Sequence, residues 1–406
     1  MNKLPAGWKL SQLEELATVE RGKFSARPRN DPKFFDGDVP FVQTGDVSAA
    51  GTYLVSHKQT LNELGKTVSK TFPRGSILIT IAANIGETAI TTYEVACPDS
   101  VVAIIPKPAK AHVFWLKKVL ETLKDDLDSK ATQNAQKNIN LEVLRPLEIV
   151  TPPIEEQTKI AQILSTWDKA IATSERLLAN SQQQKQALLE PLLSGSKRFA
   201  GYPTWTRTAF SKLLTESRLP GSNGEIAKKI TVKLYGKGVF AKDEKRIGSE
   251  STKYYRRRAG QFIYSKLDFL NGAFGIIPEH LDGYESTLDL PAFDFSELVE
   301  PAWLLQYVSR EEFYTAQLGL ANGGRKARRV NPADLLGIEI LLPSLPEQQK
   351  IAQVLSTADA EIANLQAQLD KLKLEKKALM QQLLTGKRRV RLDDEEEDMA
   401  PIRRVG

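Results

Sequence analysis

An internal repeat constrains this chain of 406 residues more than any other feature of its sequence. The segment EQTKIAQILST at 156–166 returns as EQQKIAQVLST at 347–357, with nine of eleven positions identical and an offset of 191 residues. The same offset continues without a gap as far as Arg198 and Arg389. A sequence that repeats at a long period is built from equivalent structural units. The sequence therefore predicts two halves that share one plan.

Each copy of the repeat begins a long amphipathic helix. In the second copy, apolar residues recur at alternating steps of four and three, the heptad spacing of a coiled coil, with one polar break at Lys376. The first copy has the same spacing with polar breaks at Ser174, Ser181 and Lys185. Neither apolar seam is stable in water, and a chain that carries both can pair them with each other.

Prolines and glycines mark the expected ends of these helices. Proline is tolerated at the start of a helix, and glycine is favoured just after its end. The spacing between these residues predicts helices of about 35–40 residues. The prolines before the helices are Pro152, Pro153, Pro343 and Pro346, and the glycines after them are Gly195 and Gly386.

The regions between the helices have the composition of compact α/β domains. The runs SILITI, TAITTY and VVAII in the first half, and KITVKLY, QFIYSKL and AFGII in the second, predict short strands bounded by turn residues. WLKKVLETLKDDL and WLLQYVSREEFYTAQL predict one helix in each half. Apolar positions agree between the halves while polar ones differ, as where Ile81 corresponds to Lys266. We expect similar folds with different surfaces.

A polar stretch precedes each long helix, ATQNAQKNINLEVL in the first half and ANGGRKARRVNPADLL in the second. Arg and Lys bind phosphates and guanine, whereas Asn and Gln pair with adenine. The alternative is a solvated basic loop. The candidate DNA-binding residues are Gln133, Asn134, Gln136, Lys137, Tyr235, Lys237, Lys266, Asn322, Arg325, Lys326, Arg328 and Arg329. The arginines of 256–258 fit DNA contact and alternating strand positions equally well.

Charge and composition favour a binding protein over an enzyme. A net charge of +6 fits a polyanionic partner. One cysteine, Cys97, and three dispersed histidines predict neither a disulfide nor a metal centre. The sequence lacks the polar-Pro-Pro-aromatic loop of amino-methyltransferases and the phosphate-binding G-x-x-x-x-G-K-[ST] loop. Apolar runs are too short to span a bilayer, and we expect a cytoplasmic protein.

Several motifs together resemble the specificity subunits of Type I restriction-modification systems. They are P-x-G-W-x-x-x-x-L near the start, FVQTGDV at 41–47, GSILIT at 75–80, ACPDSVVAIIP at 96–106, PPIEEQTKIAQIL, LPEQQKIAQVL and GQFIYSKLDFLNGAFGIIP at 260–278. The resemblance covers nearly the whole chain. The second half lacks a clear TGD counterpart, with KLYGKGVF in its place.

The resemblance implies two target recognition domains of similar α/β fold, which alternate with two long helices that form an antiparallel coiled-coil spacer with pseudo-two-fold symmetry. Each domain would read one half of a bipartite asymmetric DNA site. The segments are 1–150 for domain 1, 151–198 for helical region 1, 199–341 for domain 2, 342–391 for helical region 2 and 392–406 for a charged, disordered tail.

The resemblance also implies partners. Two methylation subunits would methylate adenine, and restriction subunits would use ATP to translocate and cut the DNA. S-adenosylmethionine, ATP and magnesium would belong to these subunits, and this chain would hold no cofactor. The alternatives are a stand-alone or fused DNA methyltransferase with unrecognised cofactor motifs, and a coiled-coil scaffold without a role in DNA binding.

Overall fold

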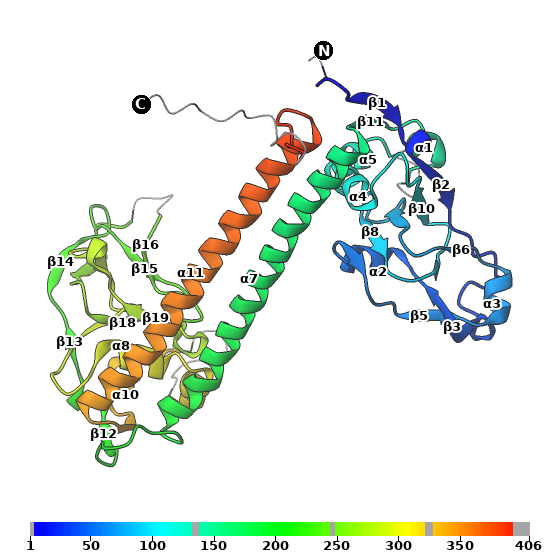
Figure 1. Ribbon diagram of the computed structural model, residues 1–406. Coiled ribbons are helices and arrows are strands. Elements are labelled where there is room, and N and C mark those ends of the chain that lie inside the picture. The colour runs from blue at the N-terminus through cyan, green and yellow to red at the C-terminus, as the bar shows by residue number, and fades with distance from the viewer. Residues whose placement is uncertain (1–3, 132–137, 244–247, 321–327, 393–406) are drawn as a thin grey trace, which may run out of the picture. The chain divides into compact units, whose positions relative to one another are not determined.

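The computed structural model describes residues 4–131, 138–243, 248–320 and 328–392 (Figure 1). The chain divides into two compact units. Unit 1 comprises Met1–Ser174 and Gln368–Gly406, and unit 2 comprises Glu175–Ala367. Each unit therefore combines one β-rich region with the first part of one long helix and the last part of the other. The five-segment division made from the sequence stays a prediction, because these units cut across both helices.

The two repeats form the long helices α7 (Ile154–Ser194, 41 residues) and α11 (Leu345–Leu384, 40 residues), which confirms the predicted helices. Gly195 and Gly386 follow them with φ of +78° and +73°, the left-handed conformation in which glycine ends a helix without steric cost. Pro346 was expected before the second helix but lies inside its first turn. A proline is tolerated there because the first amides of a helix have no partner within it.

In each unit the two helix segments run antiparallel. In unit 1, the Asp168 carboxylate of α7 forms an ion pair with Lys376 of α11. In unit 2, Lys185 of α7 forms an ion pair with Asp359 of α11 at 2.5 Å. The two pairs are equivalent under the offset of 191 residues, and both lysines are polar breaks in the heptad seams. The antiparallel pairing therefore supplies each partly buried lysine with a carboxylate, as the predicted coiled coil requires.

The residues repeated at the start of both helices are structural anchors. The Trp8 indole N–H donates to Glu156 Oε2 at 3.1 Å in unit 1, as Trp205 donates to Glu347 Oε2 at 2.9 Å in unit 2. Glu156 is 2% exposed and Glu347 is fully buried. Arg389 forms an ion pair with Glu156, as Arg198 does with Glu347, so each buried carboxylate has a cation and an indole as partners.

The glutamines that follow these carboxylates fasten each long helix to its β-rich region. The Gln157 amide donates to the Pro152 carbonyl at 2.9 Å and accepts from the His112 N–H at 2.9 Å. The Gln348 amide donates to the Pro343 carbonyl at 2.9 Å and accepts from the Glu300 N–H at 2.8 Å. Both copies of the repeat therefore carry Glu-Gln because these two side chains anchor the long helix in each unit.

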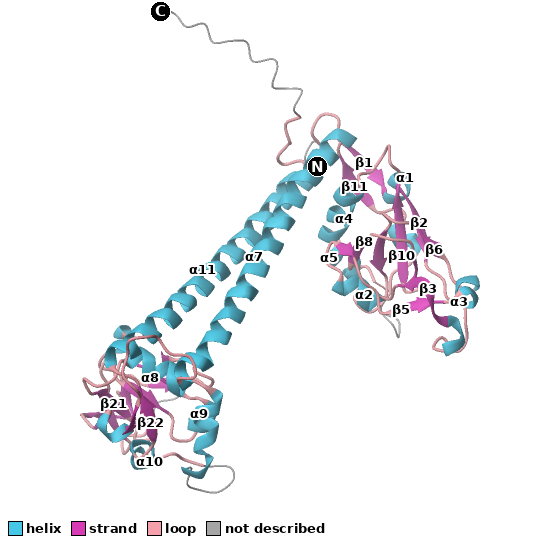
Figure 2. Cartoon of the chain, turned by 60° about the horizontal axis from the view of Figure 1, so that its bottom comes forward, coloured by secondary structure: helices cyan, strands magenta, loops and turns pink. Residues whose placement is uncertain are grey.

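Unit 1 contains a five-stranded sheet in the order β2-β10-β7-β8-β4, a four-stranded sheet β5-β3-β9-β6 and the antiparallel pair β1-β11 (Figure 2). Its strands are β1 (Lys9–Gln12), β2 (Ala17–Arg21), β3 (Phe35–Phe41), β4 (Tyr53–Leu54), β5 (Gln59–Leu61), β6 (Thr71–Phe72), β7 (Ile77–Thr80), β8 (Thr88–Thr91), β9 (Val95–Ala96), β10 (Val101–Pro106) and β11 (Glu148–Thr151). Its shorter helices are α1 (Leu13–Leu16), η1 (Pro32–Phe34), α2 (Thr44–Ala49), α3 (Glu63–Thr67), α4 (Val113–Thr122), α5 (Lys124–Ser129) and α6 (Leu141–Leu144).

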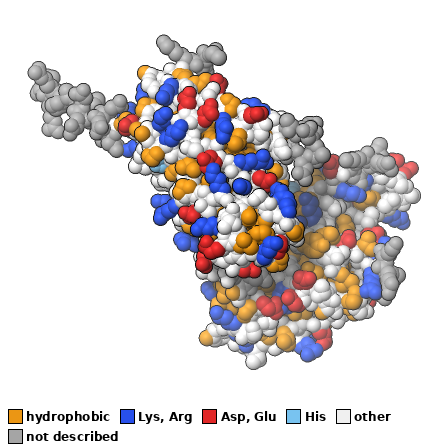
Figure 3. Space-filling view, turned by 90° about the vertical axis from the view of Figure 1, so that its right-hand side faces the viewer, with side chains coloured by type: hydrophobic (Ala, Val, Ile, Leu, Met, Phe, Trp, Pro, Cys, Tyr) orange, Lys and Arg blue, Asp and Glu red, His pale blue; other side chains and the backbone are white. Residues whose placement is uncertain are grey.

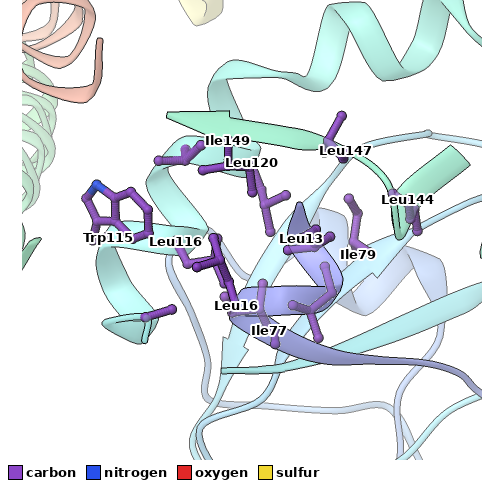
Figure 4. Close-up of a cluster of buried hydrophobic side chains, with 14 of the residues drawn as sticks. Leu13, Leu16, Ile77, Ile79, Trp115, Leu116, Leu120, Leu144, Leu147 and Ile149 are labelled. Carbon is purple, nitrogen blue, oxygen red and sulfur yellow. The ribbon is translucent and has the colours of Figure 1, made fainter. Parts of the chain in front are cut away.

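The main core of unit 1 lies between the five-stranded sheet and α4 (Figure 4). Ile77 and Ile79 of β7 belong to one buried cluster with Leu116 and Leu120 of α4, and α7 and α11 add further apolar side chains to it. Trp115 of α4 is fully buried. The helix segments of unit 1 therefore share one hydrophobic core with its sheet.

Unit 2 repeats this scaffold. Its four-stranded sheet has the order β13-β21-β18-β19, which matches β2-β10-β7-β8 of unit 1, and β12-β22 matches β1-β11. Its strands are β12 (Thr206–Ala209), β13 (Leu214–Ser217), β14 (Pro220–Asn223), β15 (Ile230–Val232), β16 (Val239–Ala241), β17 (Lys253–Arg256), β18 (Phe262–Tyr264), β19 (Phe274–Ile276), β20 (Glu285–Ser286), β21 (Ala292–Phe295) and β22 (Glu339–Leu342). The similar α/β fold predicted for the two halves is confirmed.

The units differ outside that scaffold. Unit 1 has the strand pair β5-β3, whereas unit 2 has β14 and the separate hairpin β15-β16. The helix predicted in each half is also divided: α4 and α5 meet at Leu123, while unit 2 has α8 (Pro301–Val308) and α9 (Glu311–Ala316). The break in unit 2 falls at Arg310, which is extended and pairs with Glu190 at 3.1 Å. The remaining helices of unit 2 are η2 (Phe210–Lys212), η3 (Phe269–Asn271), η4 (Glu279–Leu281), η5 (Gln317–Leu320) and α10 (Pro332–Leu336).

None of the helices among the described residues has the length and apolar character needed to cross a membrane.

The anchor at Glu156 predicts a loss of stability. Glu156→Ala leaves the Trp8 indole and the half-exposed Arg389 without their acceptor, and we expect the free energy of unfolding to fall by about 2 kcal/mol. Glu155, the preceding residue, is exposed, so Glu155→Ala is the matched control with an expected change within about 0.5 kcal/mol. Urea denaturation of both variants measures the difference, and equal losses would show that the anchor is not stabilising.

The pKa of Asp168 predicts an acid dependence. Burial alone raises this pKa, but the hydrogen bond from Lys376 and the charges of Lys118 and Lys376 outweigh burial and lower it. The stabilisation is complete above the ordinary pKa near 4 and is lost as the pH falls through the lowered value. We therefore expect Asp168→Asn to be less stable than wild type at pH 7, with the gap closing below about pH 4. Denaturation series across pH check this, with the exposed Asp125→Asn as control; a constant gap contradicts it.

Candidate nucleic-acid interface

Seven of the candidate residues lie outside the described residues, namely Gln133, Asn134, Gln136, Lys137, Asn322, Arg325 and Lys326. Ile139 and Val330 follow the two predicted DNA-binding loops in the sequence, and they form backbone hydrogen bonds at equivalent places in the two units. The Ile139 N–H donates to the Ile81 carbonyl at 3.0 Å, and the Val330 N–H donates to the Lys266 carbonyl at 3.0 Å. Ile81 and Lys266 correspond in the sequence. Their carbonyls also accept equivalent backbone hydrogen bonds, just after β7 and β18 end.

Tyr235 and Lys237 lie in the turn of the β15-β16 hairpin. The Tyr235 N–H donates to the Asn271 carbonyl at 2.9 Å, and the Gly236 N–H donates to the Gly272 carbonyl at 2.8 Å, so the turn is fixed to the loop after η3. Tyr235 has φ of +59°, although left-handed backbone is strained for a bulky residue. Its side chain is 67% exposed. The fold therefore holds an aromatic ring in solvent at a conformational cost.

Lysines lie beside two exposed aromatic rings of this hairpin. The Lys237 ammonium lies 6.0 Å from the centroid of the Tyr235 ring, and the Lys233 ammonium lies 4.1 Å from that of Phe240 on the same hairpin. Phe240 is 41% exposed. Exposed aromatic rings interleaved with lysines supply stacking surfaces and phosphate contacts together. The hairpin thus has the chemistry of a nucleic-acid contact.

Lys266, Arg328 and Arg329 lie on neighbouring backbone. The Lys266 N–H donates to the Asp289 carbonyl at 2.9 Å, and Arg329 Nε lies 3.6 Å from the Asp289 carboxylate. The segment from Lys266 to Gly272 connects this group to the Tyr235 turn through the hydrogen bonds described above. The structure therefore gathers the five described candidates of unit 2 around one loop, although their role in DNA binding stays a prediction.

The arginines of 256–258 have different surroundings. Arg257 is 1% exposed and donates to Ser286 Oγ and to the Ser217 carbonyl, each at 2.8 Å, as well as to two further carbonyls. Burial lowers the pKa of this guanidinium to about 10, which leaves it charged at neutral pH. Arg258 pairs with Asp294 at 2.9 Å. Of the two interpretations left open, the structural one therefore holds for Arg257.

Charge alone does not mark an interface. Figure 3 shows Lys and Arg side chains interleaved with acidic and hydrophobic ones on the face turned to the viewer. One basic stretch nevertheless escaped the sequence analysis. The segment 21–33, RGKFSARPRNDPK, holds five basic residues and one acidic residue. Its signal in the sequence is the local density of positive charge.

Among the residues that the structure describes, no three His, Cys, Asp or Glu side chains are grouped to hold a metal ion. Cys97 is buried in an apolar environment, which raises the pKa of its thiol to about 12. A thiol in this state is a poor nucleophile.

Comparison with known proteins identifies a family. The model of the Type I restriction modification DNA specificity domain matches residues 5–180 and 304–374, more than half of the chain. Two relatives come from Methanocaldococcus jannaschii. The Type I restriction enzyme MjaIX specificity subunit is 26% identical over 43% of this chain, and the putative type I restriction enzyme MjaX specificity subunit is 25% identical over 63%. The matched chain spans 41% and 63% of the length of these two relatives.

Solved structures share the fold. The Type-I restriction-modification system S subunit from M. genitalium matches with a TM-score of 0.57 and 14% identity, over 95% of this chain and 97% of its own. The HsdS subunit from Thermoanaerobacter tengcongensis matches with a TM-score of 0.54 and 18% identity, over 95% of this chain and 98% of its own.

The strained turn predicts an unusual order of stabilities. Glycine adopts positive φ without a steric penalty, whereas alanine keeps the strain at this position. We expect Tyr235→Gly to be more stable than Tyr235→Ala by about 1 kcal/mol, the reverse of their order in regular structure. Thermal denaturation of the two variants measures the difference. An alanine variant as stable as the glycine variant would mean that the turn relaxes and stores no strain.

Proposed function

The chain belongs to the specificity subunits of Type I restriction-modification systems, and from this premise we propose that its two units read the two halves of a bipartite asymmetric DNA site. The subunit would direct adenine methylation and ATP-dependent cleavage by partner subunits. Two methylation subunits and restriction subunits are the proposed partners. S-adenosylmethionine, ATP and magnesium would act in those partners, and this chain would contribute recognition.

The observation that carries the proposal is a shared scaffold with divergent additions. The strand order, the buried Glu-Gln anchors and the Asp–Lys pairs recur in both units. The strands outside the scaffold differ, and so does the chemistry where the scaffold strands end, with Ile81 in one unit and Lys266 in the other. Equivalent frames that present different surfaces suit two different half-sites better than one repeated ligand.

In unit 2 the proposed DNA contacts are Tyr235, Lys237, Lys266, Arg328 and Arg329. Lysines and arginines bind phosphates and the guanine edge, while an exposed ring can contact a base or its methyl group. Asn322, Arg325 and Lys326 in unit 2, and Gln133, Asn134, Gln136 and Lys137 in unit 1, remain proposed contacts outside the described residues.

Family membership disfavours the alternative of a stand-alone methyltransferase, because specificity subunits are the non-catalytic component of these enzymes. No observation among the described residues favours a scaffold without DNA binding over the recognition role.

Exchange of one recognition region tests the proposal. Replacing residues 199–330 with the equivalent segment of a relative should change one half of the methylated motif and leave the other half intact. Sequencing of methylated adenines in cells that express each chain with its methylation subunits gives the motif. An exchange that alters both halves together contradicts independent reading by the two units.

Tyr235→Gly separates binding from folding in a second assay. We expect the folded variant to lose base preference at one position of the half-site read by unit 2, by about 1–3 kcal/mol of discrimination. Fluorescence anisotropy with matched and mismatched duplexes measures this loss, and Leu298→Gly, at an exposed leucine of unit 2 outside this loop, is the control. Unchanged discrimination by a stable Tyr235→Gly variant would remove Tyr235 from the proposed interface.

A further inference from the structure

Unit 1 contains a cavity of about 250 Å³ on strands β3 and β5, the pair that has no counterpart among the described strands of unit 2. The proposed surface of unit 2 also lies on a strand pair outside the shared scaffold, the β15-β16 hairpin. Residues that line the cavity of unit 1 include Phe24, Arg29, Asn30, Phe35, Gln43 and Gln59.

Three aromatic rings provide the apolar side of the cavity. Phe24 packs against Phe41 with ring centroids 4.9 Å apart and against Phe35 at 5.7 Å. Phe24 and Phe41 are buried, whereas Phe35 is half-buried and keeps part of its surface accessible. The rings are tilted against one another rather than stacked face to face, an arrangement that aromatic pairs prefer. The cavity therefore has a preformed apolar surface.

Two glutamine amides provide the polar side. Gln59 begins β5 opposite Phe41 of β3, and Gln43 follows Phe41 by two residues, which brings the two side chains together. The Gln43 amide nitrogen donates to Gln59 Oε1. The Gln43 backbone N–H is fixed by Asp46 Oδ2 at 2.9 Å. Gln59 Nε2 keeps two N–H donors that have no acceptor among the described residues, and both glutamines are exposed.

The basic segment 21–33 forms the border of this cavity. It contributes the lining residues Phe24, Arg29 and Asn30. Arg29 pairs with the Asp99 carboxylate at 2.8 Å, and Arg21 Nε donates to the Asp99 carbonyl at 2.5 Å, so both arginines are held in place. The one acid of the segment, Asp31, is paired with Lys33 at 2.9 Å. The net charge along the border is therefore positive, as contact with a phosphate backbone requires.

Two exposed acids of β3, Asp36 and Asp38, also lie near the cavity. The pairing of β3 with β5 shifts register between Phe35 and Val39, the stretch that holds both acids. The five basic residues of segment 21–33 outnumber these two acids together with Asp31 and Asp99. Among the exposed groups that border the cavity, amides and cations prevail.

We propose that the exposed Gln43–Gln59 amide pair at the mouth of this cavity contacts the major-groove edge of an A·T base pair of duplex DNA and is a specificity determinant of unit 1. Glutamine amides pair with the N6 and N7 positions of adenine, and an apolar ring contacts the methyl group of thymine. The amide pair faces adenine and Phe35 faces the methyl group. This inference rests on the proposed function and deepens it, because it assigns an A·T base pair to unit 1. In that unit, the DNA-binding candidates from the sequence lie outside the described residues.

Two changes of the amide pair test the inference in the full chain co-expressed with its methylation subunits. Gln43→Ala combined with Gln59→Ala should lower the preference for A·T at one position of the DNA site by about 10–100-fold. That position should lie in the half-site that exchange of 199–330 leaves intact. Gln59→Glu replaces donors with acceptors, so the same position should shift away from A·T toward C·G, because a carboxylate accepts from cytosine N4. The methylated motif and its relaxed positions are read by sequencing methylated adenines.

Gln12→Ala is the matched control, since Gln12 is an exposed strand glutamine of unit 1 outside the cavity. Both substituted glutamines are exposed and the Gln43 side chain belongs to the capping box of α2, so circular dichroism should match wild type while the Gln43→Ala change lowers the melting temperature slightly. A wild-type chain that yields no two-part motif defeats the proposed function itself. A wild-type motif that both glutamine variants preserve at every position overturns this inference alone, as does a change at a G·C pair or in the half-site read by unit 2.

Discussion

The burial of two imperfect heptad seams governs the rest of the structure. Each seam carries a lysine, Lys185 in α7 and Lys376 in α11, that has to leave water when the helices pack. Antiparallel pairing brings each lysine to an aspartate of the other helix, at positions related by the repeat. A shifted register would leave these partly buried lysines without their carboxylate partners, which is unfavourable. Charge placement thus selects the register that apolar packing alone leaves open.

This pairing determines how each unit is built. Because the first part of one helix packs with the last part of the other, the core of unit 1 needs residues from the end of the chain. Met380 and Leu383 join the cluster that contains Leu13 and Ile77. The core of unit 2, by contrast, takes its helix residues from the sequence directly before and after its β-rich region, including Leu193 and Ile351. The repeated Glu-Gln anchors then fix the helix start to the region that precedes it, and for this reason those positions are the same in both copies.

The division between scaffold and surface explains how two units of one plan differ. Sheet order depends on buried apolar strands, which tolerate exchange among similar hydrophobic residues but not polar replacement. Strands added outside that sheet are free of this constraint. Unit 1 uses its added strands to build an aromatic cluster edged by amides, whereas unit 2 uses its added hairpin to display Tyr235 among lysines. The same reasoning separates structural cations from exposed ones: Arg257 serves the interior and Lys237 the surface, although both come from basic stretches of the sequence.

The sequence by itself determined the duplication, the two long helices and the α/β character of the regions between them, because periodicity and strand composition are local signals that tertiary packing reinforces. It also identified the equivalence of Ile81 and Lys266. The tertiary structure decided which basic residues are exposed, since Arg256, Arg257 and Arg258 are indistinguishable until their partners are known. It alone brought Gln43 beside Gln59 and Phe24 beside Phe41. Those contacts depend on strand pairing between distant segments, and that pairing leaves no periodic trace in the chain.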